Sequence, residues 1–299
     1  MEKPVNLKPD YVFEVSWEVC NKVGGIHTVI STKSPFMCKE YGENYILLGP
    51  DVWKETRENP EFTEDTELFK VWREKALTDG LNIRIGRWNI PGRPVAILVD
   101  FTTYFPRKNE ILAEFWEDYQ LDSISGGWDY IEHVMFGYGA AKVIENFYEY
   151  HFTSRERIIA HFHEWMTGAG ILYLEKHIPQ AGTVFTTHAT ILGRSIAGNG
   201  KLLYEHLEKL DAAALARSYN ITSKYSLEKC SAQVADCFAT VSEITARECK
   251  YLLGREPEII LPKECKVKLC LGSGTVWNPV TQWLISGCCP FFFHSPVPR

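Results

Sequence analysis

The sequence lacks the local patterns of several common protein classes. None of its nine cysteines forms a C-x-x-C pair, so zinc ribbons and thioredoxin-like redox sites have no support. It contains no G-x-G-x-x-G, no G-x-x-x-x-G-K-[ST] and no G-x-S-x-G, the fingerprints of dinucleotide sites, P-loops and many serine hydrolases. Its longest apolar stretch, residues 280–293, is interrupted by Ser, Gly and Pro and is too short to cross a bilayer. Residues 1–17 have no apolar core of signal-peptide length. We therefore expect a cytoplasmic protein with free thiols.

Excess positive charge is also missing. The 299 residues contain 32 Lys and Arg against 38 Asp and Glu, a net charge of −6. Such a chain is not expected to bind nucleic acid or an anionic membrane as its main partner. Local cationic sites for a small anion remain open.

Residues 1–262 alternate between the periodicities of strands and helices. Apolar runs of strand length recur, and helical spacing of apolar residues separates them. The expected strands are 11–17, 44–49, 81–88, 94–101, 157–163, 182–188 and 236–241, and the clearest helices are 110–119, 129–150 and 244–253. The pattern predicts an α/β domain: a Rossmann-like, mostly parallel sheet of about seven strands with helices on both faces.

Residues 263–299 differ in composition from everything before them. No Asp or Glu follows Glu264, and four of the nine cysteines fall in the last 35 residues. Neither the strand nor the helix period continues there. This composition favours a truncated or out-of-frame end, and we expect the segment to be poorly ordered.

A glycine turn follows the first expected strand. Lys22, Gly24 and Gly25 (K-V-G-G) lie between that strand and a helix, where α/β proteins bind ligands. Two glycines allow close approach to the backbone, and a helix N-terminus attracts anions. The alternative is an ordinary strand-to-helix turn.

The strand at 157–163 ends in H-F-H-E-W. His161 and His163 share one face of the strand, and Glu164 follows. This pattern allows a metal site, as in metal-dependent hydrolases. With no second His/Asp cluster at suitable spacing, we expect no metal and a hydrogen-bonded polar cluster instead.

A third strand end carries His188, and Arg194 follows six residues later. A lone buried His is usually a satisfied core residue. Here Lys22, Glu164 and His188 each follow the carboxyl end of a strand, and parallel strands bring those ends to one edge. We therefore predict that these residues and Arg194 share one site.

Together these motifs resemble the glycogen synthases of the animal and fungal type. The matching segments are F-E-V at 13–15, N-K-V-G-G-I at 21–26, A-H-F-H-E-W at 160–165, F-T-T-H-A-T-I-L-G-R at 185–194 and T-V-S-E-I-T at 240–245. The resemblance runs from about residue 11 to 262. It implies the N-terminal half of a GT-B fold. It further implies retaining transfer of glucose from UDP-glucose to the nonreducing end of an α-1,4-glucan, without a cofactor or metal.

The resemblance also assigns roles to residues. Lys22, Gly24 and Gly25 match the loop that faces the donor phosphates and glucose. His188 and Arg194 match donor-binding positions, and Glu164 matches a sugar-contacting carboxylate, so His188 and Glu164 are the expected catalytic pair.

The family's second domain, which holds most of the nucleotide pocket, has no counterpart in this sequence. The chain alone is therefore expected to be inactive, and a homo-oligomer is compatible with a complete protein. Two alternatives stay open: a non-catalytic half-domain that binds glucan or a partner chain, and a metal-dependent hydrolase using His161 and His163.

Overall fold

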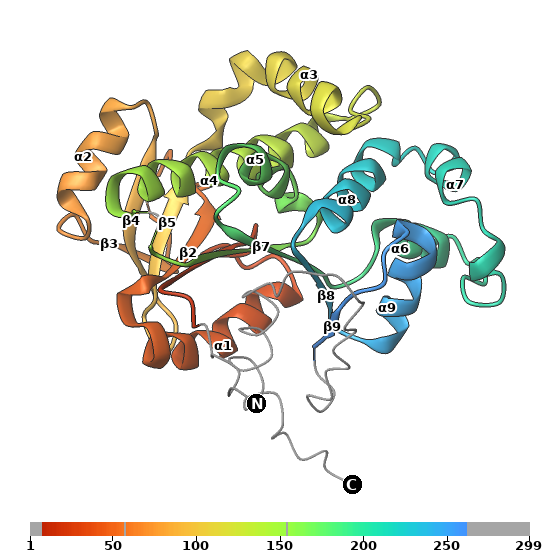
Figure 1. Ribbon diagram of the computed structural model, residues 1–299, viewed down its shortest axis with the longest axis horizontal. Helices are drawn as coiled ribbons and strands as arrows, with labels where there is room; N and C mark the ends of the chain where they lie inside the picture. Colours follow the sequence, from red (N-terminus) through yellow and green to blue (C-terminus); the bar gives the residue numbers. More distant parts are fainter. Residues whose placement is uncertain (1–7, 57, 154, 262–299) are drawn as a thin grey trace, which may run out of the picture.

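The computed structural model describes residues 8–56, 58–153 and 155–261 (Figure 1). The segment predicted to be poorly ordered, 263–299, lies outside these residues, so that prediction stays a prediction.

One sheet organises the described residues. Its nine strands lie in the order β3-β4-β5-β2-β1-β6-β7-β8-β9. Their bounds are β1 Tyr11–Val15, β2 Tyr45–Pro50, β3 Phe62–Glu64, β4 Ile83–Trp88, β5 Val95–Val99, β6 Ile158–His163, β7 Gly182–Thr187, β8 Cys237–Thr240 and β9 Ile259–Ile260. Strand β4 pairs antiparallel with β3 and β5, and the other neighbours are parallel. The predicted mostly parallel α/β sheet is confirmed. The two strands not predicted, β3 and β9, have three and two residues, too few to show a period.

The helices fill the connections between strands. They are α1 Gly25–Tyr41, α2 Lys70–Thr78, α3 Lys108–Tyr119, α4 Trp128–His151, α5 Ala169–His177, α6 Ile191–Gly198, α7 Ala212–Ser218, α8 Thr222–Val234 and α9 Glu243–Glu248. Short 3-10 helices lie at η1 Gly42–Asn44, η2 Phe101–Arg107, η3 Trp165–Thr167 and η4 Leu207–Lys209, and a π-helical turn, η5, covers Cys249–Leu253. The helix predicted at 244–253 is thus α9 continued by η5.

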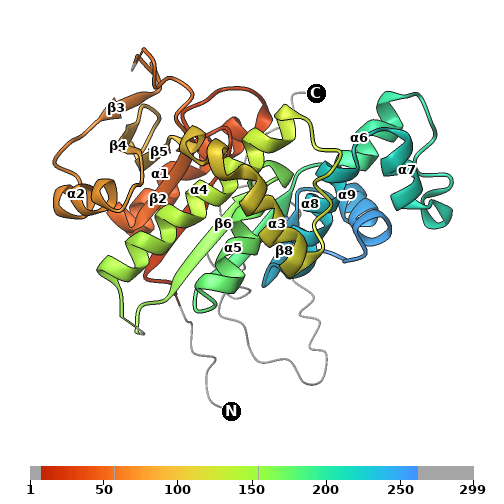
Figure 2. The same ribbon diagram turned by 90° about the horizontal axis from the view of Figure 1, so that it is seen from above.

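Helices cover both faces of the sheet. Side chains of a strand alternate between faces, so Phe13 and Val15 enter one core and Val12 enters the other. Helix α1 contributes Ile26 and Ile30 to the core on the Val12 face. Helices α4 and α5 cover the opposite face, and Figure 2 shows them together with α3 from above. Among the described residues, no helix is long and apolar enough to cross a membrane.

Two glycines let α4 and α5 pack closely behind the end of β6. A Cβ on Gly137 of α4 would lie 2.9 Å from the Thr167 carbonyl oxygen and 3.1 Å from the Gly170 nitrogen. A Cβ on Gly170 of α5 would lie 2.4 Å from the Phe162 ring. Larger residues would separate the helices and shift the segment that follows β6.

Candidate active site at the carboxyl ends of β1, β6 and β7

The strands β1, β6 and β7 are neighbours in the sheet, and their carboxyl ends meet at one edge. The glycine loop follows β1, Glu164 follows β6, and His188 follows β7. Direct hydrogen bonds join Glu164 to His188 and Arg194. Glu18 binds the Gly24 nitrogen in the glycine loop. Burial raises the pKa of Glu164, and the negative charge of Glu18 adds to that rise.

Glu164 has a strained backbone and a buried side chain. Its φ of 65° and ψ of 164° lie in a region that is essentially confined to glycine. One carboxylate oxygen, Oε1, accepts hydrogen bonds from the backbone nitrogens of His188 (2.8 Å) and Ala189 (3.2 Å) and from Arg194 Nη2 (3.3 Å). Burial raises the pKa of Glu164, and the nearby Arg194 opposes that rise. In this geometry Glu164 holds the loop after β7 through Oε1, and its expected contact with the sugar stays a prediction.

The half-buried His188 lies next to the buried His163. Its Nε2 is 3.1 Å from Nδ1 of His163, and Nε2 of His163 is 2.7 Å from Oε1 of Glu14. Burial, together with the neighbouring His163 and the positive charges of Lys33 and Arg194, lowers the pKa of His188 to about 3. His188 is therefore an uncharged imidazole at neutral pH.

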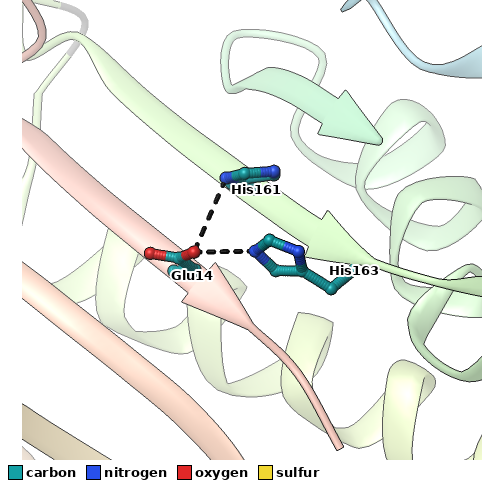
Figure 3. A group of neighbouring side chains, drawn as sticks. All are labelled: Glu14, His161 and His163. Atoms are coloured by element: carbon teal, nitrogen blue, oxygen red, sulfur yellow. Dashed lines mark hydrogen bonds and ion pairs between the residues drawn. The ribbon is translucent and has the colours of Figure 1, made fainter. Parts of the chain in front are cut away.

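Glu14 is the buried charge at the centre of this cluster (Figure 3). Lys33 Nζ lies 2.5 Å from its Oε1, and the Tyr45 hydroxyl donates to its Oε2 at 2.5 Å. Burial alone would raise the pKa of Glu14, but Lys33 and the hydrogen bond from His163 hold it well below its usual value. Sequence reasoning passed over Glu14, Lys33 and Tyr45. The available signal was an acidic residue between Phe13 and Val15 in an apolar strand, because a charge there requires a partner.

Glu14, His161 and His163 have the composition of a metal site. Their ligand atoms lie within 4.8 Å of one another. However, the Lys33 ammonium already supplies the positive charge next to Glu14, and His161 Nε2 is 2.8 Å from Thr186 Oγ1. A cation would have to displace Lys33, so these residues fit a hydrogen-bonded cluster better than a metal centre.

The glycine loop contains an internal anion. One oxygen of Glu18 accepts hydrogen bonds from the backbone nitrogens of Gly24 and His27, both at 2.8 Å. A carboxylate therefore already occupies part of the anion-binding end of α1. Lys22 is exposed, and no atom lies within 4 Å of the position where Gly25 would carry a Cβ. The open part of the loop is thus at Lys22 and Gly25.

The start of α6 is held by two further acids that the sequence did not single out. Glu228 accepts hydrogen bonds from Thr187 Oγ1 (2.8 Å) and from the Ile191 nitrogen (3.0 Å). Thr190 donates to Glu248 at 2.7 Å. Burial and, next, the charge of Glu164 raise the pKa of Glu228 to about 8. These contacts fix both ends of the turn that carries His188.

Comparison with known proteins identifies similar chains. The glycogen synthase family model matches residues 14–271. The glycogen [starch] synthase of Neurospora crassa is 34% identical over 266 residues, 89% of this chain and 37% of that protein. The liver glycogen [starch] synthase of Mus musculus is 34% identical over 258 residues, 86% of this chain and 36% of that protein. The chain thus spans less than two fifths of the length of these curated relatives. Among solved structures, a trehalose-6-phosphate synthase (OtsA) aligns with 82% of this chain and 43% of its own, at 10% identity and a TM-score of 0.38.

Proposed function

Since the chain belongs to the glycogen synthase family, we propose that it takes part in glucosyl transfer from UDP-glucose to the nonreducing end of an α-1,4-glucan, with retention and without a metal. The observation that carries the proposal is the meeting of three strand ends at one edge. That edge brings His188 and Glu164 together with the cation Arg194, and it adjoins the loop of Lys22.

The charges at this edge suit such a reaction. Glycosyl transfer develops positive charge on the sugar and negative charge on the departing phosphate. Arg194, whose side chain is 57% exposed, and the exposed Lys22 are two cations at or beside this edge that can bind the phosphate. The uncharged His188 adds no positive charge beside the sugar.

Within this proposal Glu164 also positions His188, besides its predicted contact with the sugar. Its Oε1 already binds the backbone of His188 and Ala189, so it fixes the turn that presents the imidazole. Its ion pair with Arg194 at 3.3 Å also aims that guanidinium at the same edge.

Catalysis by this family mechanism requires a second set of charges that closes over the site and excludes water. This chain spans less than two fifths of its relatives. The alternative of a non-catalytic half-domain that binds glucan or a partner therefore stays open for the isolated chain. The metal-hydrolase alternative has less support, because the Lys33 ammonium already binds the Glu14 oxygen that a metal ion would need as a ligand.

Donor binding tests the proposal in the 299-residue chain itself. UDP-glucose should shift the ring ¹⁵N signals of His188 and leave those of the exposed His206 unchanged. Arg194→Ala should weaken this binding about 10- to 100-fold, the effect of losing one hydrogen bond to a charged phosphate. Arg217→Ala, which removes an exposed arginine from α7, is the matched control. If saturating UDP-glucose leaves His188 unshifted, the proposal fails.

Transfer is measured separately with radiolabelled glucose and glycogen. The chain alone should incorporate no detectable label. In a longer form that is active, His188→Ala should lower turnover far more than it lowers glucan binding, because its role is at the transferred sugar. Incorporation by the 299-residue chain itself would show that the second domain is dispensable.

A further inference from the structure

A continuous chain of hydrogen bonds runs from α1 to the edge where His188 lies. Lys33 contacts Glu14, Glu14 contacts Nε2 of His163, and Nδ1 of His163 contacts Nε2 of His188. Glu14 is fully buried and His163 is 1% exposed. Water therefore does not replace these contacts, and each link must have one donor and one acceptor.

The positions of the hydrogens in this series of hydrogen bonds follow from its buried end, Glu14. An ionised carboxylate only accepts hydrogen bonds, so Nε2 of His163 must carry the hydrogen toward Glu14. Burial lowers the pKa of His163, so its imidazole is neutral with a single N–H, which leaves Nδ1 without a hydrogen. Nε2 of His188 must then be the donor across the 3.1 Å contact. His188 is consequently left with a bare Nδ1.

Two donors keep Glu14 in its ionised form. The Lys33 ammonium binds Oε1 and the Tyr45 hydroxyl binds Oε2. A buried carboxylate with these partners is compensated, whereas a proton on either oxygen would displace one of them. Glu14 thus determines which atom donates in each hydrogen bond of this series, although it lies two hydrogen bonds away from His188.

We propose that Glu14 is a positioning residue that, through His163, fixes His188 as the Nε2–H tautomer, so that Nδ1 of His188 can only accept a hydrogen bond. A hydroxyl can supply the hydrogen that such a nitrogen needs, and a fully ionised phosphate cannot. That this hydroxyl belongs to the transferred sugar rests on the proposed function. The tautomer itself does not.

His161 is a built-in control for this chain. It is as buried as His163 and lies on the same face of β6, but its Nε2 contacts Thr186 and its Nδ1 is 3.8 Å from Glu14. Among the described side chains, this Nδ1 is a buried nitrogen without a hydrogen-bond partner. Removing His161 therefore leaves every link to His188 in place.

The tautomers can be measured in the ligand-free 299-residue chain. Two-bond ¹H–¹⁵N correlation spectra of histidine-labelled protein distinguish a protonated ring nitrogen from a bare one. We expect Nε2–H at both His163 and His188, with each signal assigned by its loss in the corresponding His→Gln variant. A hydrogen on Nδ1 of either residue at neutral pH would overturn the proposal.

The origin of the effect is tested by removing the buried acid and its counter-cation together. Glu14→Leu with Lys33→Met leaves no unpaired charge. His163 then faces leucine, and turning its N–H toward His188 avoids burying an unsatisfied donor. An Nδ1–H signal at His188 should therefore appear in this double variant and stay absent in His161→Leu. If the folded double variant keeps His188 entirely as Nε2–H, Glu14 does not set the tautomer.

These outcomes are independent of the proposed function. The spectra need no substrate, so a failure of UDP-glucose to bind would contradict the proposed function and leave the tautomer result standing. If UDP-glucose binds but Nδ1 of His163 or His188 carries a hydrogen, the tautomer proposal is contradicted and the proposed function is left standing.

Discussion

Glutamine in place of Glu228 should stabilise the protein at neutral pH and flatten part of its pH dependence. Glu228 is fully buried, and burial followed by the charge of Glu164 raises its pKa to about 8. A protonated carboxyl and a carboxamide have nearly the same shape and both carry a donor and an acceptor. Glutamine can therefore keep the contacts to Thr187 and Ile191 without a group that ionises.

The sign and size of the effect follow from proton linkage. The ordinary pKa of glutamate is 4.5, and that of Glu228 in the folded protein is about 8. Between these two pH values the folded protein holds a proton that the unfolded chain has released. The stabilisation that this proton provides is complete below pH 4.5. It is lost progressively as the pH rises from 4.5 through 8. One pKa unit corresponds to about 1.4 kcal/mol, so wild type should lose roughly 2.5 kcal/mol between pH 5.5 and 7.5 through this group.

Urea unfolding followed by tryptophan fluorescence measures the difference. Other titrating groups are common to both proteins and cancel when the free energy of unfolding of Glu228→Gln is compared with wild type at each pH. Glu248→Gln is the matched control, since it makes the same exchange in a buried acid at the same end of α6. A stability difference between Glu228→Gln and wild type that is the same at pH 5.5 and 7.5 would refute the reasoning.

Two further predictions concern the loops at the strand ends. Glu164→Ala should lower the free energy of unfolding by at least about 2 kcal/mol in urea unfolding, because the backbone nitrogens of His188 and Ala189 lose their acceptor, whereas Glu164→Gln should lose less. Equal losses in the two variants would argue against the hydrogen bonds. Gly24→Ala should lower the thermal midpoint, with a cost of about 1 kcal/mol, because its Cβ would lie 2.9 Å from the Glu18 carboxylate that caps α1. Gly25→Ala, with no atom within 4 Å, should be neutral or slightly stabilising, and a matching loss there would point to backbone flexibility instead.

Local patterns in the sequence determined the fold class. Period-2 and apolar runs located seven of the strands, including the neighbouring β4 and β5. The rule that ligands bind beyond the carboxyl ends of parallel strands was enough to group Glu164, His188 and Arg194. These inferences succeeded because they depend on spacing along the chain, which the sequence states directly.

Tertiary structure decided what each side chain contacts. Glu14 and His163 are 149 residues apart in the sequence, and only the pairing of β1 with β6 makes them neighbours. The same holds for Glu228, which meets the turn of His188 through the packing of α8 against α6. Whether a carboxylate accepts hydrogen bonds from a backbone, from a lysine or from a ligand depends on burial and distance, and neither is encoded in local spacing. For that reason the sequence placed Glu164 and His188 at one site, and the fold determined that Glu164 holds the turn while Glu14 lies behind His188.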